Sequence, residues 1–284
     1  MSIRAVKSHA RARPTLEGAG VRLHRAFGFG ATGDFDPFLL FDDFRNDEPA
    51  EYEAGFPWHP HRGIETVTYV LAGSVEHRDS LGNRGTLGAG DVQWMTAGSG
   101  IVHQEMPQGD AGGRMHGFQL WVNLPASLKM TPPRYQDVKA AEIPEVTEAD
   151  GTRVRIVCGT WRDRKGPVEG IAAAPVYLDV AVPAGTHRAL PVEAGRHAFA
   201  YVFEGSGTFA ERVEASNRSL LLFGDGDEAV VEAGKDGIRF LLASGVPLKE
   251  AVAWHGPIVM NSREELRQAL EELENGTFLK TRRP

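Results

Sequence analysis

Short apolar segments separated by turn residues extend along almost the whole chain. They are rich in β-branched and aromatic residues, as in residues 66–71 (TVTYVL), 118–122 (FQLWV) and 219–223 (SLLLF). Glycine, proline, asparagine or aspartate ends most of these segments, and turns recur about every ten residues. Short segments with this spacing are typical of strands in a β-sandwich or β-barrel, so the pattern predicts an all-β protein.

One segment near the C-terminus has helical periodicity instead. Ser262 is followed three residues later by Glu265, which is the pattern of a capping box at a helix N-terminus. Apolar residues within 266–273 then recur on one helical face, and Asn275-Gly276 provides a stop. We therefore expect one C-terminal helix that packs on a sheet.

The two halves of the chain carry similar short motifs in the same order. Tyr69-Val-Leu-Ala-Gly73 resembles Tyr201-Val-Phe-Glu-Gly205, an offset of 132 from Tyr69 to Tyr201. A stretch rich in proline and charge, residues 129–150, separates the halves. The pattern predicts a duplicated β-barrel, with one domain over residues 1–135 and a second over residues 136–284 that ends in the helix.

Composition excludes several classes of protein. The 31 Lys and Arg against 38 Asp and Glu give a formal net charge of −7, which disfavours a nucleic-acid partner. The single cysteine, Cys158, excludes a disulfide framework and a thiolate metal cluster. The sequence contains no run of about 18 apolar residues, so no membrane-spanning segment is predicted. The N-terminus lacks the apolar part of a secretory signal. We therefore expect a cytoplasmic protein.

Histidines provide the candidate chemistry. His59 and His61 are two residues apart, and so are His103 and Glu105 on another predicted strand. Residues two apart on a strand point to the same face, so each pair projects together. Three imidazoles and one carboxylate suit a divalent first-row metal. Spacing leaves the carboxylate open, because Glu65 has the same parity as His59 and His61.

The alternative is that these histidines only form hydrogen bonds across a polar barrel mouth. Other residues have ordinary structural explanations. His77 lies in a predicted hairpin arm and is expected to be exposed, while His116 is expected to be a structural strand residue. Cys158 lies in an apolar strand and is expected to be inert packing rather than a nucleophile.

Three motifs together carry a resemblance to a known family: residues 59–69 (HPHRGIETVTY), 90–98 (GDVQWMTAG) and 100–107 (GIVHQEMP). They resemble the pirin family of the cupin superfamily. The resemblance implies a bicupin, with two antiparallel barrels and a mononuclear iron in the N-terminal one. A monomer is expected, because a bicupin buries its own barrel faces.

Carried over by position, the resemblance places the family's metal ligands on His59, His61, His103 and Glu105. Glu65 then becomes a candidate for an outer position around the metal. In the second half, Pro191 and Glu193 take the places of the first two histidines, so that barrel is expected to lack metal.

The resemblance implies two different functions. The first is quercetin 2,3-dioxygenase activity, in which dioxygen opens the central ring of a flavonol and carbon monoxide is released. Fe(II) is the expected metal, with Mn, Ni and Co suited to the same ligands, and Glu105 is the expected catalytic base. The second is a regulatory protein that binds protein partners according to the oxidation state of its iron.

Overall fold

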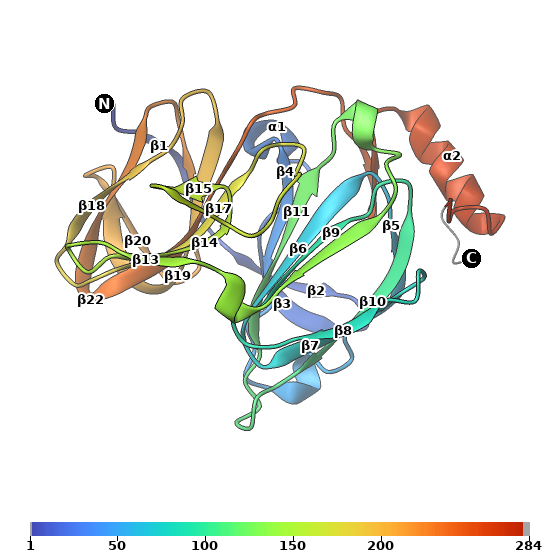
Figure 1. Ribbon diagram of the computed structural model, residues 1–284, viewed down its shortest axis with the longest axis horizontal. Coiled ribbons are helices and arrows are strands. Elements are labelled where there is room, and N and C mark those ends of the chain that lie inside the picture. The colour runs from blue at the N-terminus through green and yellow to red at the C-terminus, as the bar shows by residue number, and fades with distance from the viewer. Residues whose placement is uncertain (1, 281–284) are drawn as a thin grey trace. The chain divides into compact units, whose positions relative to one another are not determined.

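The computed structural model describes residues 2–280 and confirms the predicted all-β architecture (Figure 1). Contacts group these residues into two compact units. We call residues 13–32, 38–140 and 248–280 the histidine unit, and residues 2–12, 33–37 and 141–247 the second unit. Neither of the two α-helices within 2–280 is long and apolar enough to cross a membrane.

The histidine unit is built on two antiparallel sheets. The larger has the strand order β12 (Arg134–Val138), β9 (Val92–Thr96), β6 (Ile64–Ala72), β11 (His116–Asn123), β4 (Phe38–Asp43), β3 (Val21–Phe27) and β2 (Arg13–Glu17). The smaller has the order β5 (Phe56–His61), β10 (Ile101–Gln108), β7 (Ser74–Asp79) and β8 (Arg84–Leu87). Val21 and Val70 of the larger sheet share a buried cluster with Val75 and Leu87 of the smaller, so the two sheets enclose a common core.

The second unit is organised around one nine-stranded sheet. Its main path is β1 (Val6–Arg11), β21 (Ser219–Phe223), β19 (His197–Phe209), β22 (Glu228–Gly245), β17 (Val176–Val182), β14 (Arg153–Cys158) and β13 (Glu145–Thr147). Off this path, β18 (His187–Pro191) pairs with β22 and β20 (Val213–Ser216) pairs with β19. The long strands β19 and β22 curve across the unit, with irregular register after Val202 and after Gly205. A large apolar cluster lies inside this curved sheet.

Shorter elements complete both units. They are α1 (Thr32–Phe35), the 3₁₀ turns Pro49–Glu51, Ala126–Leu128 and Ala140–Glu142, and the two-stranded ribbons of β15 (Thr160–Trp161) with β16 (Arg164–Lys165) and β23 (Ala253–His255) with β24 (Ile258–Met260).

Each unit is made of three separate segments of the chain. The sequence pattern predicted instead a single boundary between residues 135 and 136. At the N-terminus, β1 pairs along β21 of the second unit, although residues 1–135 were expected to form the first domain. The N-terminal residues join the second unit because β1 forms backbone hydrogen bonds with β21, a strand more than 200 residues away in sequence. Such pairing satisfies the backbone groups at a sheet edge and leaves no local signal in the sequence.

The C-terminal helix, α2 (Arg263–Glu274), is present and has the predicted capping box between Ser262 and Glu265. It belongs to the histidine unit, however, rather than to the second domain where the sequence pattern placed it. Ala269 of the helix packs in one buried cluster with Ile258 and Met260 of β24. This apolar contact explains where the helix lies.

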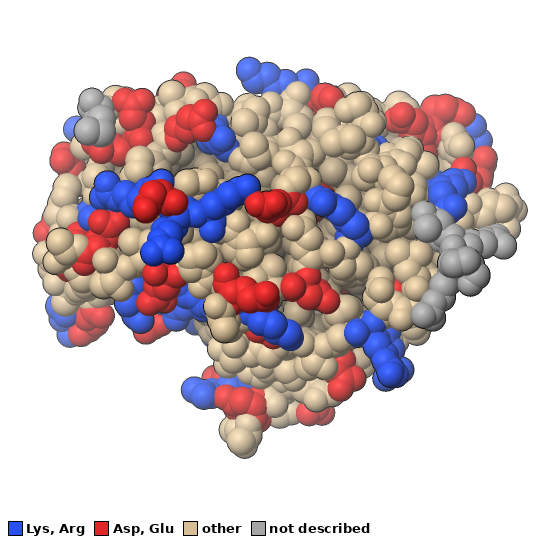
Figure 2. Space-filling view, in the orientation of Figure 1, with Lys and Arg blue, Asp and Glu red and all other residues tan. Residues whose placement is uncertain are grey.

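Charged side chains are interspersed on the visible surface. Figure 2 shows basic and acidic residues alternating over this face, without one large field of either sign. Together with the net charge of −7, this distribution gives no basic surface for a polyanion on the face shown.

Candidate metal centre

Three histidines converge because β5 and β10 pair antiparallel in the smaller sheet. In this register His59 lies directly opposite His103, and His61 lies opposite Ile101. His61 is two residues from His59, so its side chain leaves the same face of β5. The ring centroids are 4.4 Å apart for His59 and His103, 4.9 Å for His59 and His61, and 5.0 Å for His61 and His103.

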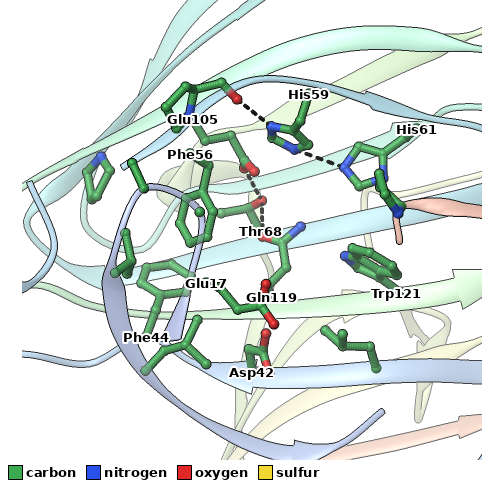
Figure 3. Close-up of a pocket in the computed structure, with 18 of the residues that line it drawn as sticks. Glu17, Asp42, Phe44, Phe56, His59, His61, Thr68, Glu105, Gln119 and Trp121 are labelled. Carbon is green, nitrogen blue, oxygen red and sulfur yellow. Dashed lines mark hydrogen bonds between the residues drawn. The ribbon is translucent and has the colours of Figure 1, made fainter. Parts of the chain in front are cut away.

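Hydrogen bonding assigns the roles of the ring nitrogens in His59. Its Nδ1 lies 2.8 Å from the carbonyl oxygen of Pro57, so Nδ1 carries the proton and donates. The unprotonated Nε2 then faces His61 Nε2 at 3.1 Å (Figure 3). His61 Nδ1 and both ring nitrogens of His103 are buried and have no hydrogen-bond partner among the described residues.

These nitrogens fit a metal ion. One nitrogen from each of His59, His61 and His103 lies within 4.8 Å of the other two, and no other group of three such ligands occurs among residues 2–280. Buried polar nitrogens without partners are costly unless a ligand satisfies them. Neutral imidazole nitrogens that face one another are the donors that divalent first-row metals take.

Burial keeps the imidazoles in the form that binds metals. Desolvation lowers the pKa of His61 and of His103 well below the ordinary value, and the positive charge of neighbouring imidazoles acts in the same direction. Both rings are therefore neutral at physiological pH, with lone pairs available for a cation.

Glu105 lies beside the three histidines but does not belong to their tight group. Its Oε2 is 3.9 Å from His103 Nε2, and its Oε1 is 3.0 Å from the Thr68 hydroxyl. A bulge between His103 and Glu105 shifts the register, so that Glu105 pairs with Phe56 instead of Pro57. Burial raises the pKa of Glu105 above its ordinary value.

Glu65 lies apart from this cluster, although its parity matches that of His59 and His61. Gly63, at φ +77°, turns the chain between β5 and β6, and a Cβ there would meet the Val259 carbonyl oxygen at 1.9 Å. Parity does not carry across such a turn. Glu65 is buried and accepts a 2.7 Å hydrogen bond from Thr96, and burial raises its pKa to about 7.

Two further histidines have structural positions. His77 is buried, which contradicts the expected exposure, because its ring stacks on Tyr135 with centroids 5.7 Å apart. His116 packs against Phe118 at 5.1 Å and does not line the cavity beside the metal cluster, as expected of a structural strand residue. Cys158 is buried in β14.

A cavity of about 660 Å³ adjoins the three-histidine cluster within the histidine unit. His59, His61 and Glu105 line it, and much of its wall is aromatic: Phe29, Phe44, Tyr52, Phe56, Trp58, Trp121 and Trp254. Trp121 meets His61 nearly at a right angle, with ring centroids 5.2 Å apart. This size and lining suit an organic molecule of about two to three rings.

The larger sheet contributes polar side chains that the sequence pattern did not assign. Asp42, Thr68 and Gln119 all line the cavity from β4, β6 and β11. Gln119 interrupts the apolar segment FQLWV, Thr68 lies inside TVTYVL, and Asp42 follows directly after the apolar segment FLLF. The sequence signal for such cavity-lining residues was a polar residue in a predicted buried strand. This signal does not show which face of the strand the polar side chain occupies.

Comparisons with known proteins identify the same family in both halves of the chain. The family model described as Pirin matches residues 20–122, and the model described as Pirin C-terminal cupin domain matches residues 177–279. A pirin-like protein of Caulobacter vibrioides is 47% identical over 280 residues, covering 98% of this chain and 100% of that protein. A Pseudomonas aeruginosa protein, provisionally named a quercetin 2,3-dioxygenase, is 46% identical over 272 residues, which is 93% of this chain and 94% of that one.

A solved structure shows the same fold. The crystal structure of quercetin 2,3-dioxygenase from Acinetobacter baumannii matches with a TM-score of 0.89 at 30% identity. The match covers 98% of this chain and 99% of that chain.

Proposed function

This chain belongs to the pirin family, and from that membership and the three-histidine cluster we propose that it is a metal-dependent dioxygenase that opens the central ring of flavonols such as quercetin. Relatives and a solved structure that carry the quercetin 2,3-dioxygenase name support the proposal. The observation that carries it is structural: the three-histidine cluster, in which His61 and His103 have ring nitrogens without a hydrogen-bond partner among the described residues, adjoins an aromatic cavity that His59 and His61 line and that is large enough for a flavonol.

The centre would hold one divalent ion through His59, His61, His103 and Glu105. We propose Fe(II), with Mn, Ni and Co as ions that suit the same donors. When bound, the ion supplies Lewis acidity and open positions for oxygen atoms of the substrate and of dioxygen.

The protein itself would orient the substrate and move its proton. Trp121 and Phe56 offer aromatic surfaces against which a planar flavonol packs, and this packing excludes water from the reacting atoms. Glu105 would accept the proton of the flavonol 3-hydroxyl when its bond to the ion loosens, because its carboxylate lies at the cavity wall. Thr68 holds one oxygen of this carboxylate in place.

The test is flavonol turnover by protein of known metal content. Protein loaded anaerobically with Fe(II) should contain about one ion per chain and should consume quercetin when air is admitted. Loss of flavonol absorbance, oxygen uptake and released carbon monoxide would be measured together. A fully iron-loaded sample that leaves quercetin unchanged would overturn the proposed function.

A further inference from the structure

A row of polar side chains crosses the cavity face of the larger sheet. Arg25 pairs with Asp42 across β3 and β4, Asp42 with Gln119 across β4 and β11, and Gln119 with Thr68 across β11 and β6. Directly opposite residues share one face of a sheet. Glu17, from the edge strand β2, joins the row through Arg25, and all five residues line the cavity.

Core packing does not explain this row, because positions that face the interior of a sheet sandwich are normally apolar. Thr68 has a role in holding Glu105. Among residues 2–280, no hydrogen bond or ion pair joins Glu17, Arg25 or Asp42 to the three-histidine cluster, yet these residues line the same cavity. In Figure 3, Thr68 and Gln119 lie between Glu105 and the pair formed by Glu17 and Asp42.

Glu17, Arg25 and Asp42 form a charged trio of defined geometry. Arg25 donates from Nε and Nη2 to the two oxygens of Asp42, both at 2.8 Å, and its Nη1 lies 2.7 Å from Glu17 Oε1. The side chain of Asp42 is only 6% exposed, whereas that of Glu17 is 39% exposed. A ligand in the cavity would therefore meet the Glu17 carboxylate, while Asp42 anchors the guanidinium.

Charge decides which ligands suit the trio. Two carboxylates and one guanidinium leave a net charge of −1, which repels a carboxylate or phosphate on a ligand. Because Arg25 already neutralises half of the acidic charge, a positively charged ligand would gain little binding free energy from the trio. Carboxylate oxygens with unused lone pairs accept hydrogen bonds strongly from neutral O–H donors.

We propose that Glu17, held in place by Arg25 and Asp42, is a specificity-determining residue that accepts hydrogen bonds from phenolic hydroxyl groups on an outer ring of the substrate. The preferred substrates are then polyhydroxylated flavonols, rather than unsubstituted or carboxylated aromatic compounds. The inference rests on the proposed function, because it assumes that the flavonol 3-hydroxyl lies at the Glu105 end of the cavity.

Glu17→Gln is the informative variant. It keeps the length of the side chain and an oxygen for Arg25 but removes the carboxylate charge, and its place on the exposed edge strand makes misfolding a minor concern. Glu48→Gln is the matched control, because it makes the same change of charge at an exposed residue that does not line the cavity.

The probes are three flavonols: 3-hydroxyflavone, which has no other hydroxyl, and its derivatives with added hydroxyls on the fused ring or on the pendant ring. Quenching of tryptophan fluorescence without oxygen would give dissociation constants for the metal-loaded protein, and turnover in air would give kcat/KM. The wild type and Glu48→Gln should favour at least one hydroxylated flavonol over 3-hydroxyflavone by about tenfold or more. Glu17→Gln should reduce that preference to within about twofold and leave 3-hydroxyflavone unchanged.

The possible outcomes separate this inference from the proposed function. An unchanged preference in Glu17→Gln, with 3-hydroxyflavone still bound and turned over, would overturn the role of Glu17 and leave the dioxygenase proposal standing. If the wild-type protein neither binds nor converts any of the three flavonols, the proposed function itself is wrong.

Discussion

The hydroxyl of Thr68 lies 3.0 Å from Oε1 of Glu105, and this hydrogen bond joins the larger sheet of the histidine unit to the smaller one. Thr68 Oγ1 also lies 2.8 Å from Gln119 Oε1. A hydroxyl has only one proton to donate. When the ionised Glu105 carboxylate accepts that proton, Gln119 must present its amide NH₂ to Thr68, so the orientation of Gln119 is linked to the charge of Glu105.

Replacing Thr68 with valine should weaken metal binding. The change removes the donor that holds Glu105 while preserving the branched shape of the side chain, and loss of such an outer hydrogen bond typically costs about 10- to 100-fold in metal affinity. Competition with a coloured chelator would measure the dissociation constant for Co(II). Thr68→Ser keeps the hydroxyl and should bind Co(II) nearly as well as the wild type; equal affinity in all three proteins would show that Thr68 does not support the centre.

Glu105→Gln should separate metal binding from turnover. The amide keeps the size of the carboxylate and can still accept the hydrogen bond from Thr68, and the three histidines remain, so some metal should stay bound. Loss of the base should lower kcat by about 10²- to 10⁴-fold. Metal content and quercetin turnover would be measured on the same sample, and full activity in the variant would show that Glu105 is not the base.

His61→Ala should abolish the stabilisation that a bound metal provides. An ion that binds only the folded protein stabilises it by about 2.7 kcal/mol at a concentration 100 times Kd, which raises Tm by several degrees. Scanning calorimetry with and without added Co(II) should show this shift for the wild type and for His9→Ala, an exposed histidine of the second unit. A shift that persists in His61→Ala would place the ion elsewhere.

Glu65→Gln should stabilise the protein in a pH-dependent manner and leave metal content unchanged. Burial raises the pKa of Glu65 from 4.5 to about 7, so folding favours its protonated form. The wild type therefore loses stability as pH rises from about 4.5 to about 7, whereas a neutral glutamine does not. The gain should reach up to about 3 kcal/mol above pH 7, as measured by urea unfolding at several pH values. Loss of the metal in this variant would instead show that Glu65 supports the centre.

Arg62→Met should destabilise the histidine unit. Arg62 follows His61 directly and is buried, and it bonds to the Ser99 carbonyl at 2.8 Å and to Glu272 of α2 at 2.7 Å. Removing it leaves the Ser99 carbonyl, and the Phe278 carbonyl to which Arg62 also donates at 2.6 Å, without this donor, at about 1–3 kcal/mol each. Glu272 loses one partner but keeps Lys280 and Gln268. Chemical denaturation would measure the loss. Arg263→Met, at an exposed position of the same helix, is the control and should change stability by less than about 0.5 kcal/mol.

Much of the centre follows from local pattern. A strand alternates its side chains at every residue, so the spacing of His59 and His61 is enough to place both rings on one face. The same rule covers His103 and Glu105, although a bulge shifts Glu105 within the register. Capping of the C-terminal helix by Ser262 and Glu265 is equally local and was predicted correctly.

Long-range pairing decided what local pattern left open. The parity of Glu65 matched that of His61, but the turn at Gly63 sends Glu65 to a different environment, and only the folded chain shows that turn. Likewise, no local pattern shows that α2 packs beside β24, because that contact depends on apolar surface brought together from distant parts of the chain.

Local pattern in the sequence is enough to predict the all-β class, the two similar halves and the shared face of His59 and His61, because strand periodicity acts over a few residues. The meeting of His103 with these two histidines depends on the pairing of β10 with β5. Tertiary structure alone decided that Glu17, Arg25 and Asp42 line the same cavity as His59 and His61. Their strands meet only through cross-strand register, and register depends on hydrogen bonds between segments that are distant in sequence.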